Sequence, residues 1–155
     1  MVKPNFKKMD KLKLNFEIIP TGAFNFNLRS QFSKKAWDII RKDAYQRADG
    51  KCSICNSPSI RLEAHEVWEF NKEKKIQKLK DVIGICHKCH TVIHINRAHL
   101  TNEIDVAIAH FKRVNNVDYQ GYVKALKDAN EKNIELSKIY DWSLDLSYLE
   151  KFIKD

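Results

Sequence analysis

Hydrophobic residues recur at every second position over residues 12–18, where leucine, phenylalanine and isoleucine alternate with lysine, asparagine and glutamate. This period is typical of a half-buried strand, which we expect to end near Pro20. Residues 1–10 are polar and lysine-rich and predict a flexible basic tail. Residues 25–32 have no clear period and predict a connector.

The period lengthens to that of a helix after Ser33, whose side chain is a preferred N-cap. A helix running to about Ala48 would gather an apolar stripe of Trp37, Ile40, Ala44 and Tyr45. Gly50 stands where a left-handed residue would end this helix. The exposed face would carry Lys34, Lys35, Arg41, Lys42 and Arg47. Such a face suits either a nucleic-acid backbone or simply solvent.

Two short strands and a helix are expected in the middle of the chain. Ala64 and His65 point to opposite faces of a first strand that begins at Leu62, and residues 82–85 form a second, more apolar strand. The charged residues 71–80 between them are expected to form a loop or a hairpin tip. A short helix follows, so the predicted order is strand, loop, strand, helix.

Helical periods dominate residues 98–155. Asn102 is expected to cap a first helix with an apolar stripe, and Asp118 a longer second one. His110, beside the first stripe, is expected to be structural. The predicted fold class is therefore α+β. We expect one domain over residues 1–155, with a core at about residues 33–97, an N-terminal strand and helix, and a helical C-terminal extension at about residues 98–155.

Composition agrees with one globular domain. A chain of 155 residues with 43% hydrophobic residues is long enough for a single core. It has no apolar run of membrane-spanning length, and its N-terminus has no apolar segment of the kind that secretory signals contain. We therefore expect no membrane partner and a cytoplasmic location, where cysteine pairs more often bind metal than form disulfides.

The net charge of +8 is concentrated in the first two thirds of the chain. Residues 1–51 contribute +7, residues 52–100 contribute +3 and residues 101–155 contribute −2. A positive field attracts polyanions, so this part of the chain is suited to nucleic acid. Lysines that merely keep a small protein in solution would give the same total.

The four cysteines form two Cys-x-x-Cys pairs, Cys52 with Cys55 and Cys86 with Cys89. Two such pairs separated by about 30 residues can close one tetrahedral Zn²⁺ site with four thiolates. A site with four protein ligands supports folding and offers no position for a substrate. We therefore expect a structural zinc site.

Three histidines lie near the second cysteine pair. His90 and His94 are four residues apart, so both would project from one face of a helix, and His65 can come alongside from the first strand. A divalent ion held by three imidazoles keeps open positions and can act as a Lewis acid on a phosphodiester. Glu66 is the nearest candidate base, but a bulge or strand end would be needed for it to face the site together with His65.

The segments CSIC, LEAHE and VIGICHKCHTVIH together resemble the zinc-knuckled HNH endonucleases of the His-Me finger group. The resemblance covers about residues 33–97 and implies a small ββα-metal core, which is a two-stranded hairpin plus one helix. It implies that His65 is the first-strand metal ligand and that His90 and His94 are the helix ligands. It also implies a structural zinc held by the four cysteines and a second divalent metal, Mg²⁺, Mn²⁺, Ni²⁺ or Zn²⁺, at the active site.

Two positions differ from the family's pattern. Glu66 stands where a catalytic histidine usually follows the first-strand ligand, and Asp81 stands where an asparagine usually opens the second strand. Glutamate is a competent base, although its usual pKa of ~4.3 is low for the task unless burial raises it. In an alternative register His65 is itself the base, which leaves His90 and His94 as the protein ligands.

The resemblance implies a metal-dependent endonuclease that hydrolyses phosphodiester bonds in nucleic acid, in DNA in preference to RNA. Its catalytic residues would be His65, Glu66 and His90. Similar nucleases occur in phages and in host defence. Two alternatives stay open: a catalytically silent zinc module that binds nucleic acid, and a zinc domain that is structural or binds protein. The sequence leaves the oligomeric state unknown.

Overall fold

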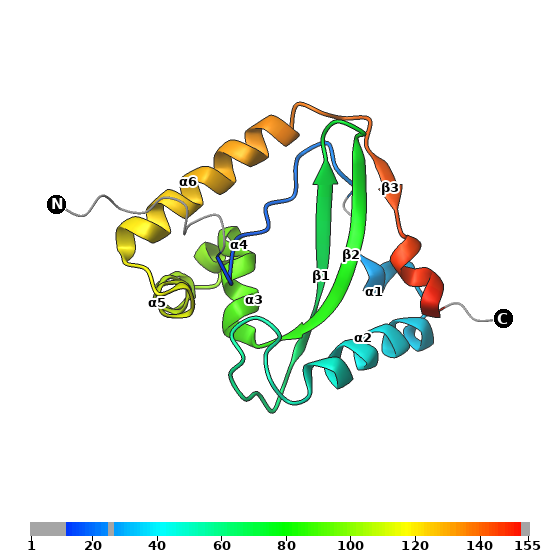
Figure 1. Ribbon diagram of the computed structural model, residues 1–155, viewed down its shortest axis with the longest axis horizontal. Helices are drawn as coiled ribbons and strands as arrows, with labels where there is room; N and C mark the ends of the chain where they lie inside the picture. The colour runs from blue at the N-terminus through cyan, green and yellow to red at the C-terminus, as the bar shows by residue number, and fades with distance from the viewer. Residues whose placement is uncertain (1–11, 25–26, 153–155) are drawn as a thin grey trace.

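The computed structural model describes residues 12–24 and 27–152, so the expected tail at residues 1–10 lies outside it. The fold is α+β, as predicted. A three-stranded sheet in the order β1-β2-β3 lies between two groups of helices (Figure 1). Its strands are β1 (Glu63–Asn71), β2 (Ile76–Ile85) and β3 (Ser143–Asp145).

β1 and β2 form an antiparallel hairpin, and β3 pairs in parallel with the start of β2. The hairpin is longer than expected, because residues 76–80 belong to β2 and only residues 72–75 form the turn. The prediction of a loop over residues 76–80 was wrong. Gln77 and Leu79 are fully buried, whereas the lysines between and after them face solvent, which is the in-and-out alternation of a strand.

Helix α2 (Lys34–Ala48) begins where the sequence predicts, since the Ser33 side chain accepts a hydrogen bond from the backbone N–H of Ala36. Asp49, and not Gly50, is the left-handed C-cap, with φ 53°, and Gly50 follows at φ 76°. Within the expected connector the chain forms one helical turn, α1 (Leu28–Gln31). Its cap is Asn27, whose side chain accepts from the backbone N–H of Arg29.

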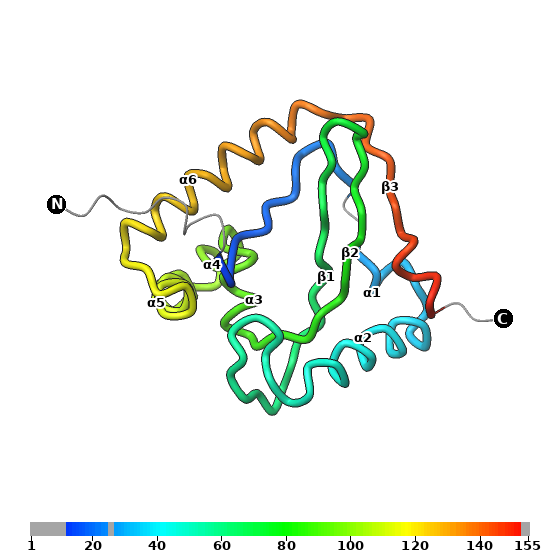
Figure 2. The backbone as a smooth tube through the Cα atoms, viewed as in Figure 1, coloured from blue at the N-terminus to red at the C-terminus, as the bar shows by residue number. Residues whose placement is uncertain are grey.

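The predicted strand at residues 12–18 was wrong, because this segment belongs to no sheet. The alternation nevertheless marks burial: Leu14 is fully buried and the ring of Phe16 stacks on that of Phe111 at 5.0 Å. The Asn115 side chain bonds the Leu14 N–H at 3.0 Å and its C=O at 2.8 Å, and the Glu17 N–H donates to the Ile93 carbonyl. The segment thus runs beside helices, as Figure 2 traces in dark blue.

The C-terminal half is helical, as predicted. Its α-helices are α3 (His87–Ile93), α4 (Ile95–Leu100), α5 (Ile104–Asn115) and α6 (Tyr119–Leu136), and a 3-10 helix, η2 (Ser147–Phe152), ends the described chain. Asp118 caps α6 as expected, accepting from the Gly121 N–H at 2.9 Å. The cap expected at Asn102 was one residue early: Glu103 is the N-cap of α5, and Asn102 has φ 57°.

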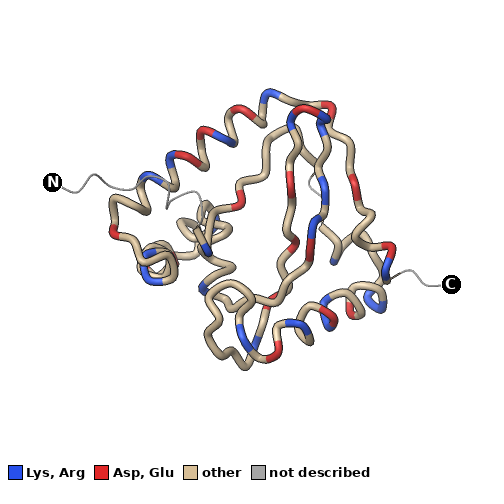
Figure 3. Tube along the Cα trace, viewed as in Figure 1, with Lys and Arg blue, Asp and Glu red and all other residues tan. Residues whose placement is uncertain are grey.

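Hydrophobic side chains form two clusters, one on each side of the hairpin. The first lies among α3, α4, α5, α6 and the N-terminal segment, around Phe111. The second lies among α2, η2 and the other face of the sheet, around Leu79 and Val82. Basic and acidic residues are interspersed along α2 and α6 (Figure 3). Among the helices of the described ranges, none has both the length and the apolar composition needed to cross a bilayer.

Replacing Phe111 with alanine should lower the free energy of unfolding by about 3–5 kcal/mol, because it removes a fully buried ring and leaves a cavity. Ile134→Ala is the control, since Ile134 is 59% exposed and its change should stay within about 0.5 kcal/mol. Denaturant unfolding of the zinc-loaded proteins measures both. Equal losses in the two variants would contradict a core centred on Phe111.

Candidate metal centres

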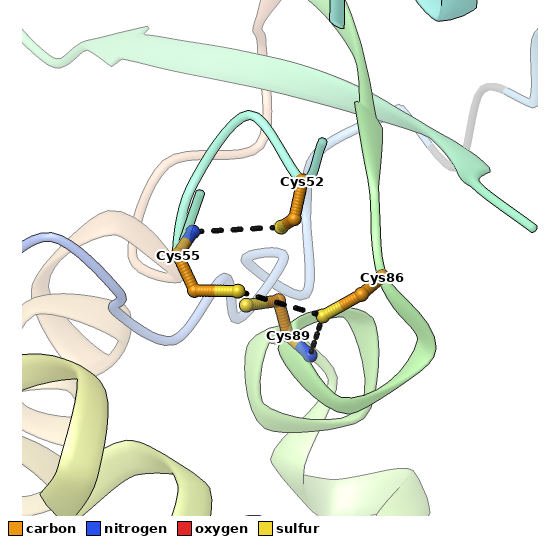
Figure 4. A group of neighbouring side chains, drawn as sticks. All are labelled: Cys52, Cys55, Cys86 and Cys89. Atoms are coloured by element: carbon orange, nitrogen blue, oxygen red, sulfur yellow. Dashed lines mark hydrogen bonds between the residues drawn. The ribbon is translucent and has the colours of Figure 1, made fainter. Parts of the chain in front are cut away.

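The four cysteine sulfurs meet between the turn after α2 and the start of α3 (Figure 4). All four Sγ atoms lie within 4.8 Å of one another, and those of Cys55 and Cys86 are 3.8 Å apart. Tetrahedral zinc with bonds of about 2.3 Å places its sulfurs about 3.8 Å apart. None of the four is in a disulfide. The cluster can therefore hold one zinc ion, as the sequence predicts.

Local backbone geometry prepares each pair for a cation. The N–H groups of Ile54 and Cys55 point at the Cys52 sulfur, at 3.4 and 3.5 Å, and the Cys89 N–H points at the Cys86 sulfur at 3.5 Å. Cys86 is also the N-cap of α3. Such donors favour thiolates, which are the forms that bind zinc.

The four sulfurs constrain one another's charge. A hydrogen bond from the Cys89 thiol lowers the pKa of Cys52 to about 4, and the same interaction, together with burial, raises the pKa of Cys89. Burial raises the pKa of Cys86 as well. Several thiolates this close together repel one another, so a divalent cation is the natural counter-charge for the group.

His110 supports the thiolate cluster from α5. The Arg113 guanidinium, which can only donate, lies 2.9 Å from Nδ1 of His110, so the ring carries its hydrogen on Nε2. Nε2 lies 3.1 Å from the Cys89 sulfur and donates to it. Burial lowers the pKa of His110, which favours this neutral form. The expected structural role of His110 thus has a specific partner.

His65, His90 and His94 converge as a second group, with one nitrogen of each within 4.8 Å of the other two. His65 comes from β1, His90 from α3, and His94 from the junction of α3 and α4. The ring centres are 5.4, 5.5 and 5.0 Å apart, so one point lies about 3 Å from all three. This is roughly the distance from a metal ion to the centre of a ligating imidazole.

Two carboxylates hold two of these rings. Glu17 Oε2 lies 3.1 Å from Nε2 of His65, and Glu63 Oε1 lies 2.8 Å from Nδ1 of His90. Each ring therefore keeps its other nitrogen available for a ligand. A carboxylate that takes the outer nitrogen of a metal-binding histidine is the usual arrangement in protein metal sites. His94 has no side-chain hydrogen bond among the described residues.

The electrostatic environment keeps the helix histidines neutral. Burial, helped by the nearby His90, His65 and Arg97, lowers the pKa of His94 to about 4. Burial also lowers the pKa of His90, although its hydrogen bond to Glu63 acts in the opposite direction. Because a metal binds the neutral imidazole, these rings are ready to ligate at neutral pH without losing a proton first.

Glu66 lies on the opposite face of β1 from His65, as regular alternation requires. The strand has a bulge, but between Val67 and Trp68, so it does not turn Glu66 toward the histidines. Oε1 of Glu66 accepts a hydrogen bond from the backbone N–H of Leu28 at 2.8 Å. Burial raises the pKa of Glu66. Glu66 and the three histidines nonetheless line the same groove.

The groove has a volume of about 1570 Å³ and follows the open edge of β1, between α1 and α2 on one side and α3 and α4 on the other. Its basic lining residues are Arg29, Lys34, Arg41, Arg61 and Arg97, and its aromatic ones are Phe24, Trp37, Tyr45 and Trp68. Arg41 pairs with Asp38 at 2.8 Å. The other four basic residues have no acidic partner within 4.0 Å in the described ranges.

Asp81 is placed away from the histidines. Its Oδ1 accepts from the Tyr148 hydroxyl at 2.9 Å and from the Val82 N–H at 2.8 Å, and it lies 3.4 Å from the Arg47 guanidinium. Arg47 also donates to the Val82 carbonyl at 2.6 Å. Asp81 and Arg47 thus fasten α2 and η2 to the sheet, and Arg47 is not available on the basic face expected for α2.

Sequence reasoning missed Glu17, Glu63 and the contact of His110 with Cys89. Glu63 had a signal, because it stands two residues before His65 on the same strand face. Glu17 and His110 had none, since each reaches its partner only through the tertiary fold. Comparisons of the chain with protein-family models, curated proteins and solved structures find no match. The interpretation of both clusters therefore rests on their own geometry.

Cys86→Ser should lower the zinc content below one ion per chain and destabilise the fold, because a structural zinc ion contributes folding energy. Glu66→Ala should keep both zinc and structure, since Glu66 lies outside the sulfur cluster. Elemental analysis with far-UV circular dichroism compares the two. Equal loss of zinc and structure in both variants would refute the inference that the cysteine cluster supports the fold and that Glu66 does not.

His110→Ala should speed the loss of zinc to a chelator by about 10–100-fold, because Cys89 loses its hydrogen-bond donor. His110→Gln can still donate from its amide and should fall between this variant and the unchanged protein. His99→Ala, at an exposed position, is the control and should leave the rate unaltered. The assay follows zinc release with a chromogenic chelator, and identical rates for all variants would exclude this role.

Proposed function

We propose that the protein is a metal-dependent endonuclease of the HNH type, which hydrolyses phosphodiester bonds in nucleic acid, in DNA in preference to RNA. One observation carries the proposal: imidazoles from β1 and from α3 gather within 4.8 Å of one another, in a groove lined by five basic side chains and by Glu17, Asp38, Glu63 and Glu66. The hairpin β1–β2 followed at once by α3 supports a ββα-metal core. The cluster of four cysteines at the start of α3 is also consistent with the resemblance to the zinc-knuckled HNH endonucleases.

The donor set fits a second divalent ion. His65, His90 and His94 are neutral nitrogen ligands on one side of the site, and the groove leaves the other side open to a phosphate. When bound, the ion would supply Lewis acidity toward a phosphate oxygen. This arrangement favours His65 as a ligand over His65 as the base.

Glu66 is the proposed general base. Burial raises the pKa of its carboxyl group, which brings it closer to the range in which a base works at neutral pH. The Leu28 N–H donates to Oε1, and the Trp68 side chain also hydrogen-bonds the carboxylate, so a water molecule in the groove would use the remaining lone pairs of the two oxygens. Glu66 would take a proton from this water while the water oxygen attacks phosphorus. The bond from phosphorus to the departing sugar oxygen then breaks, and that oxygen takes a proton from solvent.

Basic side chains on both walls would hold the substrate. Arg97 lies on α4 next to the histidines, whereas Arg29 and Lys34 lie on the opposite wall. Contacts of this kind bind phosphates without reading sequence, and they weaken as salt rises. Trp37 and Tyr45, also on that wall, would contact bases or sugars of the substrate with their aromatic side chains.

Glu66→Gln should slow cleavage of supercoiled plasmid by about 10²–10⁴-fold, because the amide cannot accept the water's proton. His90→Ala should abolish cleavage by removing a metal ligand. Glu69→Gln is the matched control: it lies on the same strand, pairs with Lys80 and does not line the groove, so activity should be unchanged. Each protein is assayed with Mg²⁺, Mn²⁺ or Ni²⁺ on duplex DNA, single-stranded DNA and RNA.

Absence of cleavage with every metal, together with salt-sensitive binding of nucleic acid, would replace the proposal with a silent zinc module that binds nucleic acid. Absence of any such binding would leave a structural or protein-binding zinc domain. Cleavage that survives in His90→Ala would reject the histidine cluster as the active site.

A further inference from the structure

A chain of hydrogen-bonded side chains leads from α5 to His90. Glu103 Oε2 lies 2.7 Å from Nε2 of His87, and Nδ1 of His87 lies 3.0 Å from Oε2 of Glu63. The other oxygen of Glu63, Oε1, lies 2.8 Å from Nδ1 of His90. Four residues from three elements, β1, α3 and the N-terminus of α5, thus form one continuous path.

Each member of this path has its position set by the next. Glu63 places one oxygen on each histidine, so holding His87 fixes the plane of the carboxylate that faces His90. The bond from Glu63 to Nδ1 of His90 puts the hydrogen on that nitrogen and leaves Nε2 as the acceptor. Only this tautomer of His90 can offer Nε2 to a ligand.

Besides His87, the Glu103 side chain has hydrogen-bonding partners in Thr101 and Thr91. Glu103 is the N-cap residue of α5, but its side chain makes no capping hydrogen bond. His87, at 63% side-chain exposure, contributes little to the core. Exposed ion pairs add little to stability, so the contacts of Glu103 with His87 and of His87 with Glu63 contribute little to folding. Their main effect is on the orientation of His90, whose side chain is only 25% exposed.

We propose that Glu103 and His87 are positioning residues, which hold Glu63 so that His90 presents Nε2 to a divalent cation. The C-terminal extension thereby supplies outer support to the histidine cluster. This inference rests on the metal site of the proposed function but not on nuclease activity. It assigns roles to two residues for which sequence spacing indicates none.

Metal affinity of the zinc-loaded protein tests the proposal without nucleic acid. Titration with Co²⁺, followed by visible absorption, reports both the affinity and the ligand field of the histidine cluster. Glu63→Ala should weaken binding about 10–100-fold. Glu103→Ala should weaken it about 2–5-fold, in keeping with the loss of a partly exposed ion pair. Asp105→Ala, in the first turn of the same helix, is the matched control and should bind as the unchanged protein does.

The double variant decides whether the residues act in series. If Glu103 acts through Glu63, adding Glu103→Ala to Glu63→Ala should cause no further loss of Co²⁺ affinity. Histidine ¹⁵N spectra of the zinc-loaded protein should also show His90 shifting away from the Nδ1–H tautomer in Glu63→Ala and in Glu103→Ala. Glu103→Gln, which keeps the shape of the side chain, guards against a simple folding defect.

Equal Co²⁺ affinity in Glu103→Ala and Asp105→Ala would overturn the relay and leave the nuclease proposal standing. Additive losses in the double variant would overturn it too, because Glu103 would then act independently of Glu63. Co²⁺ binding with the expected order of variants but no cleavage would refute the nuclease and keep the relay. Failure of the unchanged protein to bind a second divalent ion, Zn²⁺ included, would overturn both.

Discussion

The convergence of four cysteine sulfurs is the constraint on which the rest of the structure depends. Cys52 and Cys55 lie in the turn after α2, whereas Cys86 and Cys89 lie at the junction of β2 and α3, and all four sulfurs come within 4.8 Å of one another. Sulfurs this close carry too much shared charge to stay together as thiolates without a cation. A zinc ion there would join α2, the hairpin and α3 at one point. α3, which starts at this junction, carries His90 and ends at His94.

The open edge of β1 explains why the chemistry gathers where it does. In the order β1-β2-β3, β1 is paired on one side only among the described residues, so residues from both of its faces reach the groove along this edge. His65 enters from the face toward α3 and Glu66 from the face toward α1 and α2. His65 and Glu66 thus line one groove from opposite faces of β1, and the bulge between Val67 and Trp68 does not turn Glu66 toward the histidines.

The C-terminal extension does more than cover hydrophobic surface. Phe111 fills the first core, and on the same helix His110 donates to Cys89 while Glu103, at the helix start, reaches His87. One helix therefore touches the outer shell of both clusters. Polar groups around a metal site set the tautomer and orientation of its ligands, so support of this kind bears on affinity as well as on stability.

Local patterns were enough to predict much of this molecule. The sequence determined the α+β class, the Ser33 and Asp118 caps, the cysteine pairs and the histidine spacing, since each depends on residues near one another in the chain. Alternation at residues 12–18 predicted burial correctly but not pairing, because Asn115 and Ile93 supply the partners that a strand would have supplied. Only the tertiary structure decided that Glu17 holds His65, that Glu63 holds His90 and that α5 reaches both clusters. Those contacts join residues far apart in the chain, and their geometry follows from how helices pack on the hairpin, which no local period encodes.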